Sequence, residues 1–256
     1  MRTWSAAELR AFLEATVDHA LHTLWLLAAM TGLRCSELVG LRWPDVDLTA
    51  GTLTVRHTVV EAEDGYELAD EQKTVGSART IHLDGDTVAA LRAHRTRQLE
   101  VRLAAPTWND HDLVFCADDG GWRSPASVSQ AFRRAVRRTG LPSIRFHDVR
   151  HTHTSLLLRA GVNPKVLSER LGHSSVAFTL DTYAHVISGM QPEAAELLAD
   201  LVLRDGDHDV TMTDRPDTRS RSRRSKGPAP SASKARTAPS TSPPAAGPTR
   251  GPASSP

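Results

Sequence analysis

The spacing of hydrophobic positions predicts that the chain begins with helices. Apolar residues recur at helical spacing after Ser5, and Glu8 stands three residues beyond it, as in a capping box. The apolar positions between residues 19 and 30 predict a second helix that ends at Gly32, and a short third helix is expected around Glu37.

An alternating pattern follows these helical segments. Leu53 and Val55 alternate with threonines, Asp64-Gly65 marks a turn, and residues 79–83 alternate again. We therefore expect a small antiparallel sheet of about three strands.

Helical spacing returns in the second half of the chain. A long helix is expected from residue 86 to 103, and another opens at Ser124-Pro125 and ends at Gly140. After His147 the pattern is helical, with breaks at glycines and prolines. The predicted fold class is α+β, mainly α, with a small antiparallel sheet.

The end of the chain has a different composition. Residues 205–256 are rich in Pro, Ser, Ala and Arg and hold few apolar side chains. Such a segment cannot bury enough surface to offset the entropy lost on ordering. We expect a folded domain at 1–204 and a disordered tail at 205–256, and a DNA-binding arm is the alternative interpretation of the tail.

Charge is divided unevenly between these two parts. The whole chain has a net charge of +1, and residues 205–256 hold nine Lys or Arg against five Asp, a net of +4, which leaves −3 for residues 1–204. A DNA-binding domain commonly shows a basic excess. Composition alone therefore does not indicate nucleic-acid binding, and any contact with DNA must come from local patches.

The sequence indicates neither secretion nor membrane insertion. Cys35 and Cys116 are far apart and follow no signal peptide, so neither a disulfide framework nor a CxxC metal site is expected. The most apolar segment, residues 21–30, is about half as long as a bilayer-spanning helix. A cytoplasmic protein without a membrane segment is the expectation.

Two scarce residue types mark candidate positions for chemistry. Residues 1–204 contain only two lysines, Lys73 and Lys165, and the whole chain has only two tyrosines, Tyr66 and Tyr183. A lysine ammonium can give up a proton more readily than arginine, so Lys73 beside a predicted turn is a candidate general acid. A solvated lysine and a packed tyrosine are the structural alternatives.

His147 and Arg150 stand three residues apart at the predicted start of a helix, and so share one face. There an imidazole and a guanidinium can hold one phosphate, assisted by the helix N-terminus. A surface helix with exposed side chains is one alternative. A zinc site that includes His151 and His153 is another, although the Glu of an HExxH motif is missing.

Two further clusters contain charged or nucleophilic side chains. Arg34 follows a helix-ending glycine, and Glu37 stands three residues later. This pair is either a structural salt bridge, or Arg34 reaches a phosphate while Glu37 fixes the local geometry. His173 lies in a predicted glycine turn, ten residues ahead of Tyr183.

In combination, these motifs resemble those of the tyrosine recombinase family, the phage-type integrases. TGLRCSEL resembles the segment of the first catalytic arginine, KTVGSARTIHL that of the hairpin lysine, and HDVRH the H-x-x-R pair. LGHSS and TLDTYAHV resemble the segments of the second histidine and of the nucleophilic tyrosine. The resemblance covers residues 3–200 and assigns catalytic roles, in chain order, to Arg34, Lys73, His147, Arg150, His173 and Tyr183.

The resemblance implies a site-specific recombinase or integrase that cleaves and rejoins DNA strands through a 3′-phosphotyrosine. Arg34 and Arg150 would clamp the non-bridging phosphate oxygens. His173 would be a further donor and His147 an acid/base assistant, while Lys73 would protonate the leaving 5′-oxygen. No cofactor is implied, neither ATP nor a metal.

The resemblance also implies partners. Double-stranded DNA is the expected substrate, and a homo-oligomer, a tetramer on DNA, is the expected assembly. The last helix, residues 191–203, would pack on a neighbouring protomer through Leu197, Leu198 and Leu201. Family members usually carry an N-terminal core-binding domain, which we expect to be missing from this chain.

Other functions remain open at this point. A catalytically idle, integrase-derived DNA-binding fragment would keep the same motifs, and covalent adduct formation would distinguish it from an enzyme. A type IB topoisomerase or a telomere resolvase shares the chemistry, but the short length and LGHSS favour the integrase type. A zinc hydrolase is the remaining alternative.

Overall fold

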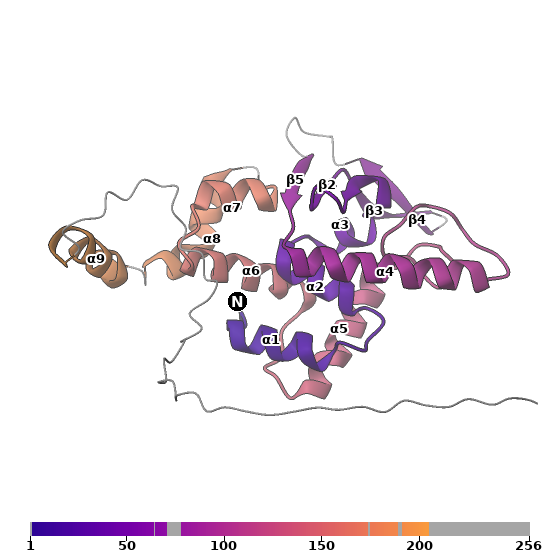
Figure 1. The fold of residues 1–256 in the computed structure, drawn as a ribbon, viewed down its shortest axis with the longest axis horizontal. Coiled ribbons are helices and arrows are strands. Elements are labelled where there is room, and N and C mark those ends of the chain that lie inside the picture. Colours follow the sequence, from indigo (N-terminus) through magenta and orange to yellow (C-terminus); the bar gives the residue numbers. More distant parts are fainter. Residues whose placement is uncertain (1, 64, 71–77, 174, 189–190, 205–256) are drawn as a thin grey trace, which may run out of the picture. The chain divides into compact units, whose positions relative to one another are not determined.

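The structure is a computed structural model that describes residues 2–63, 65–70, 78–173, 175–188 and 191–204. Most of this part is helical, as predicted (Figure 1). The helical elements are α1 (Ala6–Ala15), α2 (His22–Thr31), α3 (Cys35–Val39), η1 (Trp43–Asp45), α4 (Gly85–Ala104), α5 (Pro125–Thr139), α6 (Phe146–Arg159), α7 (Pro164–Leu171), α8 (Val176–Ser188), α9 (Gln191–Ala199) and the π-helical η3 (Asp200–Arg204).

Two predictions fall on residues outside the described ones. Lys73 lies within the segment 71–77, and the proposed tail is residues 205–256. In the part of the chain that the structure does describe, no helix has the length and apolar character needed to cross a membrane.

The described strands form the predicted small antiparallel sheet of three strands and, in addition, a separate two-stranded hairpin. The first has the order β1-β2-β5 and the second is a β3-β4 hairpin. Both edges of β2 are occupied, by β1 and β5, so the chain that follows β2 pairs with its own hairpin partner. The strands are β1 (Val46–Asp47), β2 (Thr52–Val55), β3 (His57–Ala62), β4 (Gly65–Asp70) and β5 (Arg79–His82).

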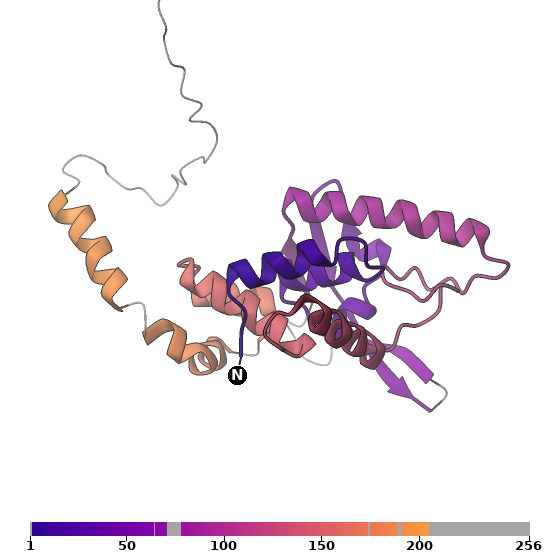
Figure 2. The same ribbon diagram turned by 90° about the horizontal axis from the view of Figure 1, so that it is seen from below.

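Helix α2 is apolar on all sides because other helices surround it. Leu24, Trp25, Leu27 and Ala28 are all buried, and α2 contacts α1, α3, α4 and α6. A helix enclosed in this way lacks the polar face of a surface helix. Figure 2 shows the long helix α4, in magenta, along one margin of the folded body.

An aromatic cluster attaches the N-terminal segment to α6. The ring centroids of Trp4 and Phe12 lie 5.2 Å apart, and those of Phe12 and Phe132 lie 5.0 Å apart. The Trp4 amide also donates to Thr152 Oγ1 at 3.1 Å. Buried aromatic pairs of this kind stabilise beyond the area that they bury. Phe132 also contacts Phe146 of α6, with ring centroids 5.4 Å apart. The cluster therefore helps to position α6, the helix that carries His147 and Arg150.

Local capping signals fix the starts of α1 and α6. The predicted capping box of α1 is present: the Ser5 amide donates to Glu8 Oε2 at 2.7 Å, and the Glu8 amide donates to Ser5 Oγ at 3.2 Å. At α6, the Arg145 amide donates to Asp148 Oδ2 at 2.8 Å. Because α6 begins at Phe146, His147 lies in its first turn.

Candidate functional site

Arg150 connects three segments that are distant in the sequence. Its side chain is buried, and Nη1 donates to the Gly32 carbonyl at 2.7 Å while Nη2 donates to the Leu171 carbonyl at 2.8 Å. These carbonyls precede Arg34 and His173 in their respective motifs. A guanidinium has five N–H donors, so further donors remain for another oxygen ligand.

The charge of Arg150 persists despite its burial. Burial lowers the pKa of Arg150 to about 10, with a further contribution from the charge of Arg34, while Glu37 acts in the opposite direction. The side chain is therefore protonated at neutral pH, and a buried cation of this kind favours an anionic ligand.

A buried carboxylate holds two arginines. Glu37 Oε1 accepts from Arg34 Nη1 at 2.8 Å, and Oε2 accepts from the Arg34 amide and from Arg79 Nη2, each at 2.8 Å. The Glu37 side chain is 0% exposed, whereas that of Arg34 is 40% exposed. Arg34 is thus the member of this cluster that is most accessible to a ligand.

The arginines keep Glu37 ionised. Burial by itself would raise the pKa of the Glu37 carboxyl, but the Arg79 guanidinium and the hydrogen bond from the Arg34 amide more than offset this, so that the pKa lies below its ordinary value. Both alternatives that the sequence left open for this pair are therefore compatible with the geometry: Glu37 forms a salt bridge with Arg34 and also fixes its position.

Sequence reasoning missed Arg79. Its Nε donates to the Arg170 carbonyl at 2.9 Å, so Arg79 connects β5 to the end of α7 as well as to Glu37. The signal was present in the alternation of β5, where Arg79 and Ile81 share the buried face and Thr80 is exposed. An arginine on the inward face of a strand requires a partner, and the sequence did not show which one.

Two glycines allow close packing at the segments that carry Arg34 and His173. Gly32 has φ +69°, and a Cβ atom there would lie 2.7 Å from His153 Cδ2. Gly172 has φ +67°, and a Cβ atom there would lie 2.7 Å from Arg79 Nη1. Both the positive φ and the lack of space exclude other side chains. Gly32 therefore lets the Arg34 segment pack against His153 and Leu171, and Gly172 lets the His173 segment pack against Arg79.

His173 lies beside the arginines. Its Nδ1 is 2.7 Å from Thr179 Oγ1, and the ring contacts Phe178 with its edge. Burial lowers the pKa of His173 to about 4, and the charges of Arg150, Arg34 and Arg79 add to the shift. His147 is lowered in pKa by burial and by Arg150. The histidines are therefore neutral at pH 7 within a field dominated by arginines.

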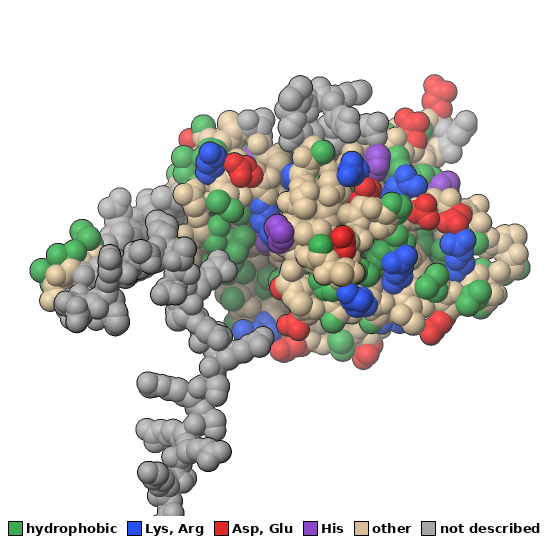
Figure 3. Space-filling model, turned by 45° about the horizontal axis from the view of Figure 1, so that its top comes forward, with side chains coloured by type: hydrophobic (Ala, Val, Ile, Leu, Met, Phe, Trp, Pro, Cys, Tyr) green, Lys and Arg blue, Asp and Glu red, His purple; other side chains and the backbone are tan. Residues whose placement is uncertain are grey.

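Exposed charges of both signs are mixed on one face of the molecule. On the face shown in Figure 3, basic and acidic side chains are interspersed over the body and do not form one large basic patch. This agrees with the small net charge of residues 1–204.

Tyr183 lies in the interior next to the same helix α6. It is 1% exposed and packs with Leu158, Leu167 and Leu171. Its backbone is non-helical within α8 (φ −114°, ψ 17°), and its hydroxyl is 2.7 Å from His151 Nδ1. Burial raises the pKa of the Tyr183 hydroxyl above its ordinary value, although Thr154 and Arg150 act against the shift.

The structure thus brings most of the predicted site residues together. Arg34, His147, Arg150 and His173 influence one another electrostatically, and Tyr183 lies close to Arg150. Lys73 is outside the described residues. His151 contacts the tyrosine hydroxyl, and the sequence had suggested it only as a zinc ligand.

The histidines of α6 do not gather into a metal site. His153 is buried, with its Nδ1 2.8 Å from the Ala29 carbonyl, whereas the His147 and His151 rings contact each other with centroids 4.8 Å apart. Within the described ranges, no group of three or more His, Cys, Asp or Glu side chains is arranged to hold a metal ion.

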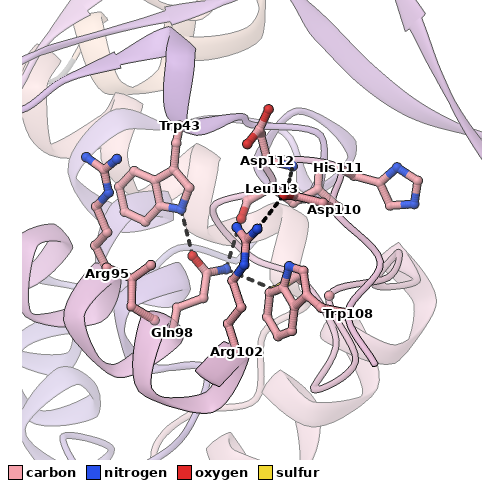
Figure 4. A pocket seen from close by; sticks show the side chains of 12 residues that line it. Trp43, Arg95, Gln98, Arg102, Trp108, Asp110, His111, Asp112 and Leu113 are labelled. Carbon is pink, nitrogen blue, oxygen red and sulfur yellow. Dashed lines mark hydrogen bonds and ion pairs between the residues drawn. The ribbon is translucent and has the colours of Figure 1, made fainter. Parts of the chain in front are cut away.

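A separate cavity of about 100 Å³ lies between η1, α4 and the segment that follows α4 (Figure 4). Gln98 lies at its centre, where its Oε1 accepts from Trp43 Nε1 at 2.6 Å and its Nε2 donates to the Leu113 carbonyl at 2.9 Å. Arg102 forms an ion pair with Asp110 at 2.6 Å. These polar groups bond to one another, and none of the predicted site residues lines this cavity.

The lowered histidine pKa values predict that stability depends on pH. His151, His153 and His173 have pKa values of about 4, mainly because of burial. The unfolded chain takes up these protons near pH 6.5, so it binds more protons than the folded chain between about pH 6.5 and pH 4. The free energy of unfolding, measured by urea titration, should therefore fall as the pH is lowered through this window.

A variant provides the control for this prediction. His153→Gln removes one of the titrating groups and should make the pH dependence shallower. A free energy of unfolding that remains constant or rises from about pH 6.5 to pH 4 would contradict the assignment of buried, neutral histidines.

Comparison with known proteins identifies the class. Residues 4–189 match the phage integrase family. The chain is 33% identical over 215 residues to a XerC-like tyrosine recombinase of Caldanaerobacter subterraneus subsp. tengcongensis, in a match that covers 79% of this chain and 55% of the relative. It is 30% identical over 205 residues to the ICEBs1 integrase of Bacillus subtilis, with coverage of 79% and 55%.

Solved structures share the fold. The Tn1549 transposon integrase in complex with transposon right end DNA has a TM-score of 0.66 at 23% identity, over 78% of this chain and 66% of that one. XerA recombinase has a TM-score of 0.57 at 23% identity, over 78% and 65%. The mainly helical fold with small antiparallel sheets is therefore that of tyrosine recombinase catalytic domains.

The chain belongs to the phage integrase family, the tyrosine recombinases. Its relatives include recombinases and integrases of mobile elements, and tyrosine recombinases cleave and rejoin DNA. The chain spans about half the length of the curated relatives that it matches.

Proposed function

We propose that this chain is a site-specific DNA recombinase or integrase that cleaves and rejoins strands through a 3′-phosphotyrosine on Tyr183. The observation that supports it most strongly is the position of Arg150. Its buried guanidinium donates to the Gly32 and Leu171 carbonyls and so holds the segments of Arg34 and His173 close to one cation. Further N–H groups of this guanidinium can donate to a phosphate.

In this proposal the arginines stabilise the phosphate. Arg34 and Arg150 hold the non-bridging oxygens of the scissile phosphate, where negative charge develops as the attacking oxygen adds. His173 supplies a further hydrogen bond, and His147 assists proton transfer at the edge of the site. Arg34 is held by Glu37, which in turn holds Arg79, so that little reorganisation is needed when the phosphate enters.

The chemistry conserves the phosphodiester bond energy. The Tyr183 oxygen forms a bond to phosphorus, the bond to the 5′-oxygen breaks, and the 5′-oxygen takes a proton, which we assign to Lys73 from its position in the sequence motif. A 5′-hydroxyl of another strand can then attack the phosphotyrosine and release Tyr183.

We further propose double-stranded DNA as the substrate and a homotetramer on DNA as the assembly. Supporting evidence comes from α9 and η3, where Leu197 and Leu198 are 63% and 62% exposed and Val202 and Leu203 are also exposed. An exposed apolar stripe of this kind is suited to contact another protomer. The side chain of Leu201, which was predicted to join this stripe, is outside the described part.

The proposed function predicts a covalent adduct that depends on a single tyrosine. With a nicked suicide substrate drawn from the flanking DNA of its own gene, the protein should form a denaturant-resistant protein–DNA complex, and Tyr183→Phe should abolish it, because phenylalanine has no nucleophilic oxygen. The chain offers a matched control, since Tyr66 is its only other tyrosine. Tyr66→Phe should retain the adduct.

The outcomes distinguish the proposal from its main rival. Adduct formation in Tyr183→Phe, or loss of the adduct in Tyr66→Phe alone, would contradict the assignment of the nucleophile. A folded wild-type protein that binds DNA without forming any adduct would favour a catalytically idle DNA-binding fragment.

A further inference from the structure

His151 occupies the position from which the proton of the nucleophile can be removed. It follows Arg150 directly on α6, and its Nδ1 lies 2.7 Å from the Tyr183 hydroxyl oxygen. This is within the range of a strong hydrogen bond and within the reach that a general base requires. His147 lies one turn earlier and contacts the His151 ring edge-on, with the ring centroids 4.8 Å apart.

We propose that His151 is the general base of strand cleavage, which accepts the Tyr183 proton and returns it during strand rejoining. The inference rests on the proposed recombinase function and deepens it. The motif resemblance assigned acid/base assistance to His147. The inference instead assigns the role of general base to His151, which lies one turn later on α6 and contacts the reacting hydroxyl.

The surroundings of His151 keep its ring neutral before the substrate binds. Burial lowers its pKa to about 4, and His147, Arg150 and Arg145 lower it further, whereas Asp148 raises it. From the other elements, Tyr183 of α8 and His173 face the same ring. At neutral pH the imidazole is therefore uncharged, and one ring nitrogen has a free lone pair.

Binding of the substrate strengthens the base when it is needed. Without substrate, His151 is a weak base, because burial and the nearby positive charges disfavour its protonated form. A phosphodiester bound by Arg34 and Arg150 brings negative charge into the same cluster, and the charge grows as the transition state forms. Nearby negative charge stabilises an imidazolium and raises its pKa.

His151 takes up the tyrosine proton during cleavage and returns it during rejoining. As the Tyr183 oxygen bonds to phosphorus, its proton passes to His151 Nδ1, and the imidazole becomes an imidazolium. The 5′-oxygen leaves with a proton from the separate acid. When a 5′-hydroxyl later attacks the phosphotyrosine, the tyrosine oxygen leaves and takes its proton back from His151. No oxidant, metal or other reactant is consumed.

The kinetic test uses His151→Asn, in which an amide keeps a polar group near the position of Nδ1 but cannot take up a proton. Single-turnover cleavage of the suicide substrate should be slower by about 10²- to 10⁴-fold, the usual contribution of a general base. A Tyr66→Phe background leaves Tyr183 as the only tyrosine, so fluorinated tyrosine can be incorporated at that position alone.

Fluorination separates proton removal from structural support. A fluorinated phenol is more acidic and needs less help to lose its proton, so it should restore most of the lost rate in His151→Asn. His147→Asn is the matched control on the same helix, and fluorination should not restore its rate to a comparable degree. A residue that only holds Tyr183 in place would not show this rescue, because fluorination does not repair a displaced side chain.

The possible results are distinct. Wild-type-like cleavage by His151→Asn, or a slow rate that fluorination leaves unchanged, would overturn the inference while the recombinase function stands. Absence of any adduct in the wild-type protein would contradict the proposed function and the inference together. A rate deficit that fluorination corrects in His151→Asn, and not in His147→Asn, is the result that we expect.

Discussion

Substitution of Arg150 by lysine is expected to slow covalent adduct formation by about 10²- to 10³-fold, the usual effect of removing one transition-state donor. Lysine keeps a positive charge, but it has a single ammonium group in place of a planar fork. The wild-type guanidinium donates to Gly32 and Leu171 and has further donors for a phosphate. An ammonium cannot span both carbonyls and also clamp a phosphate in two places.

A control on the same helix tests whether the loss is specific. Arg159 lies in the last turn of α6 and is exposed. Arg159→Lys should cleave the suicide substrate at the wild-type rate. Circular dichroism should show the wild-type helical signal for both variants. If folded Arg150→Lys cleaves within a few-fold of wild type, the central place given to Arg150 is wrong.

Replacement of Glu37 by leucine is expected to lower the free energy of unfolding by about 3–5 kcal/mol, because breaking a buried ion pair on one side leaves a buried charge uncompensated. Glu37 is fully buried and receives hydrogen bonds from Arg34 and Arg79, and the Arg79 side chain is only 8% exposed. Removal of the carboxylate leaves the Arg79 guanidinium in the interior without this counter-charge. Urea denaturation monitored by tryptophan fluorescence measures the loss.

A double variant provides the internal check. In Glu37→Leu/Arg79→Met both charges are absent, and apolar side chains of similar length fill the space. The double variant should be more stable than Glu37→Leu alone, since removing both members of a buried pair costs much less than removing one. If the loss of stability caused by Arg79→Met adds fully to the loss caused by Glu37→Leu, the two residues are not coupled as their 2.8 Å contact indicates.

Local signals made much of the fold predictable from the sequence. The capping box at Ser5 and Glu8, and the helix-ending Gly32 and Gly140, act within a few residues, and the structure has the corresponding helix boundaries. Such caps satisfy backbone groups that the helix itself leaves open, so the same residues signal the same boundary in different folds.

Pairing between distant segments was harder to predict. The sequence indicated strands near Leu53 and Arg79, but the separate β3-β4 hairpin arises because β1 and β5 occupy both edges of β2. Alternation defines a strand and its buried face, but it does not specify which strand lies alongside. The sequence therefore predicted a small antiparallel sheet, but not the separate hairpin beside it.

For the site, too, local signals were predictable and contacts between distant segments were not. Short motifs pointed to Arg34, Arg150 and Tyr183, whereas the roles of Arg79 and His151 depend on contacts across the fold. Arg79 reaches Glu37 over 42 positions in the sequence, and His151 reaches Tyr183 over 32. No sequence feature near Arg79 or His151 indicates which residue each one contacts. The catalytic roles assigned to the six motif residues remain predictions for the experiments described above.

The central claim, that Tyr183 becomes covalently bound to DNA, can be tested most directly by mapping the attachment point. After cleavage of a suicide substrate, digestion with trypsin and nuclease should give the peptide 171–204, which contains Tyr183 as its only tyrosine and has no internal Lys or Arg. The account predicts that mass spectrometry will find the added nucleotide on Tyr183 of this peptide. Attachment at another residue, or a wild-type protein whose peptide is always unmodified, would contradict it.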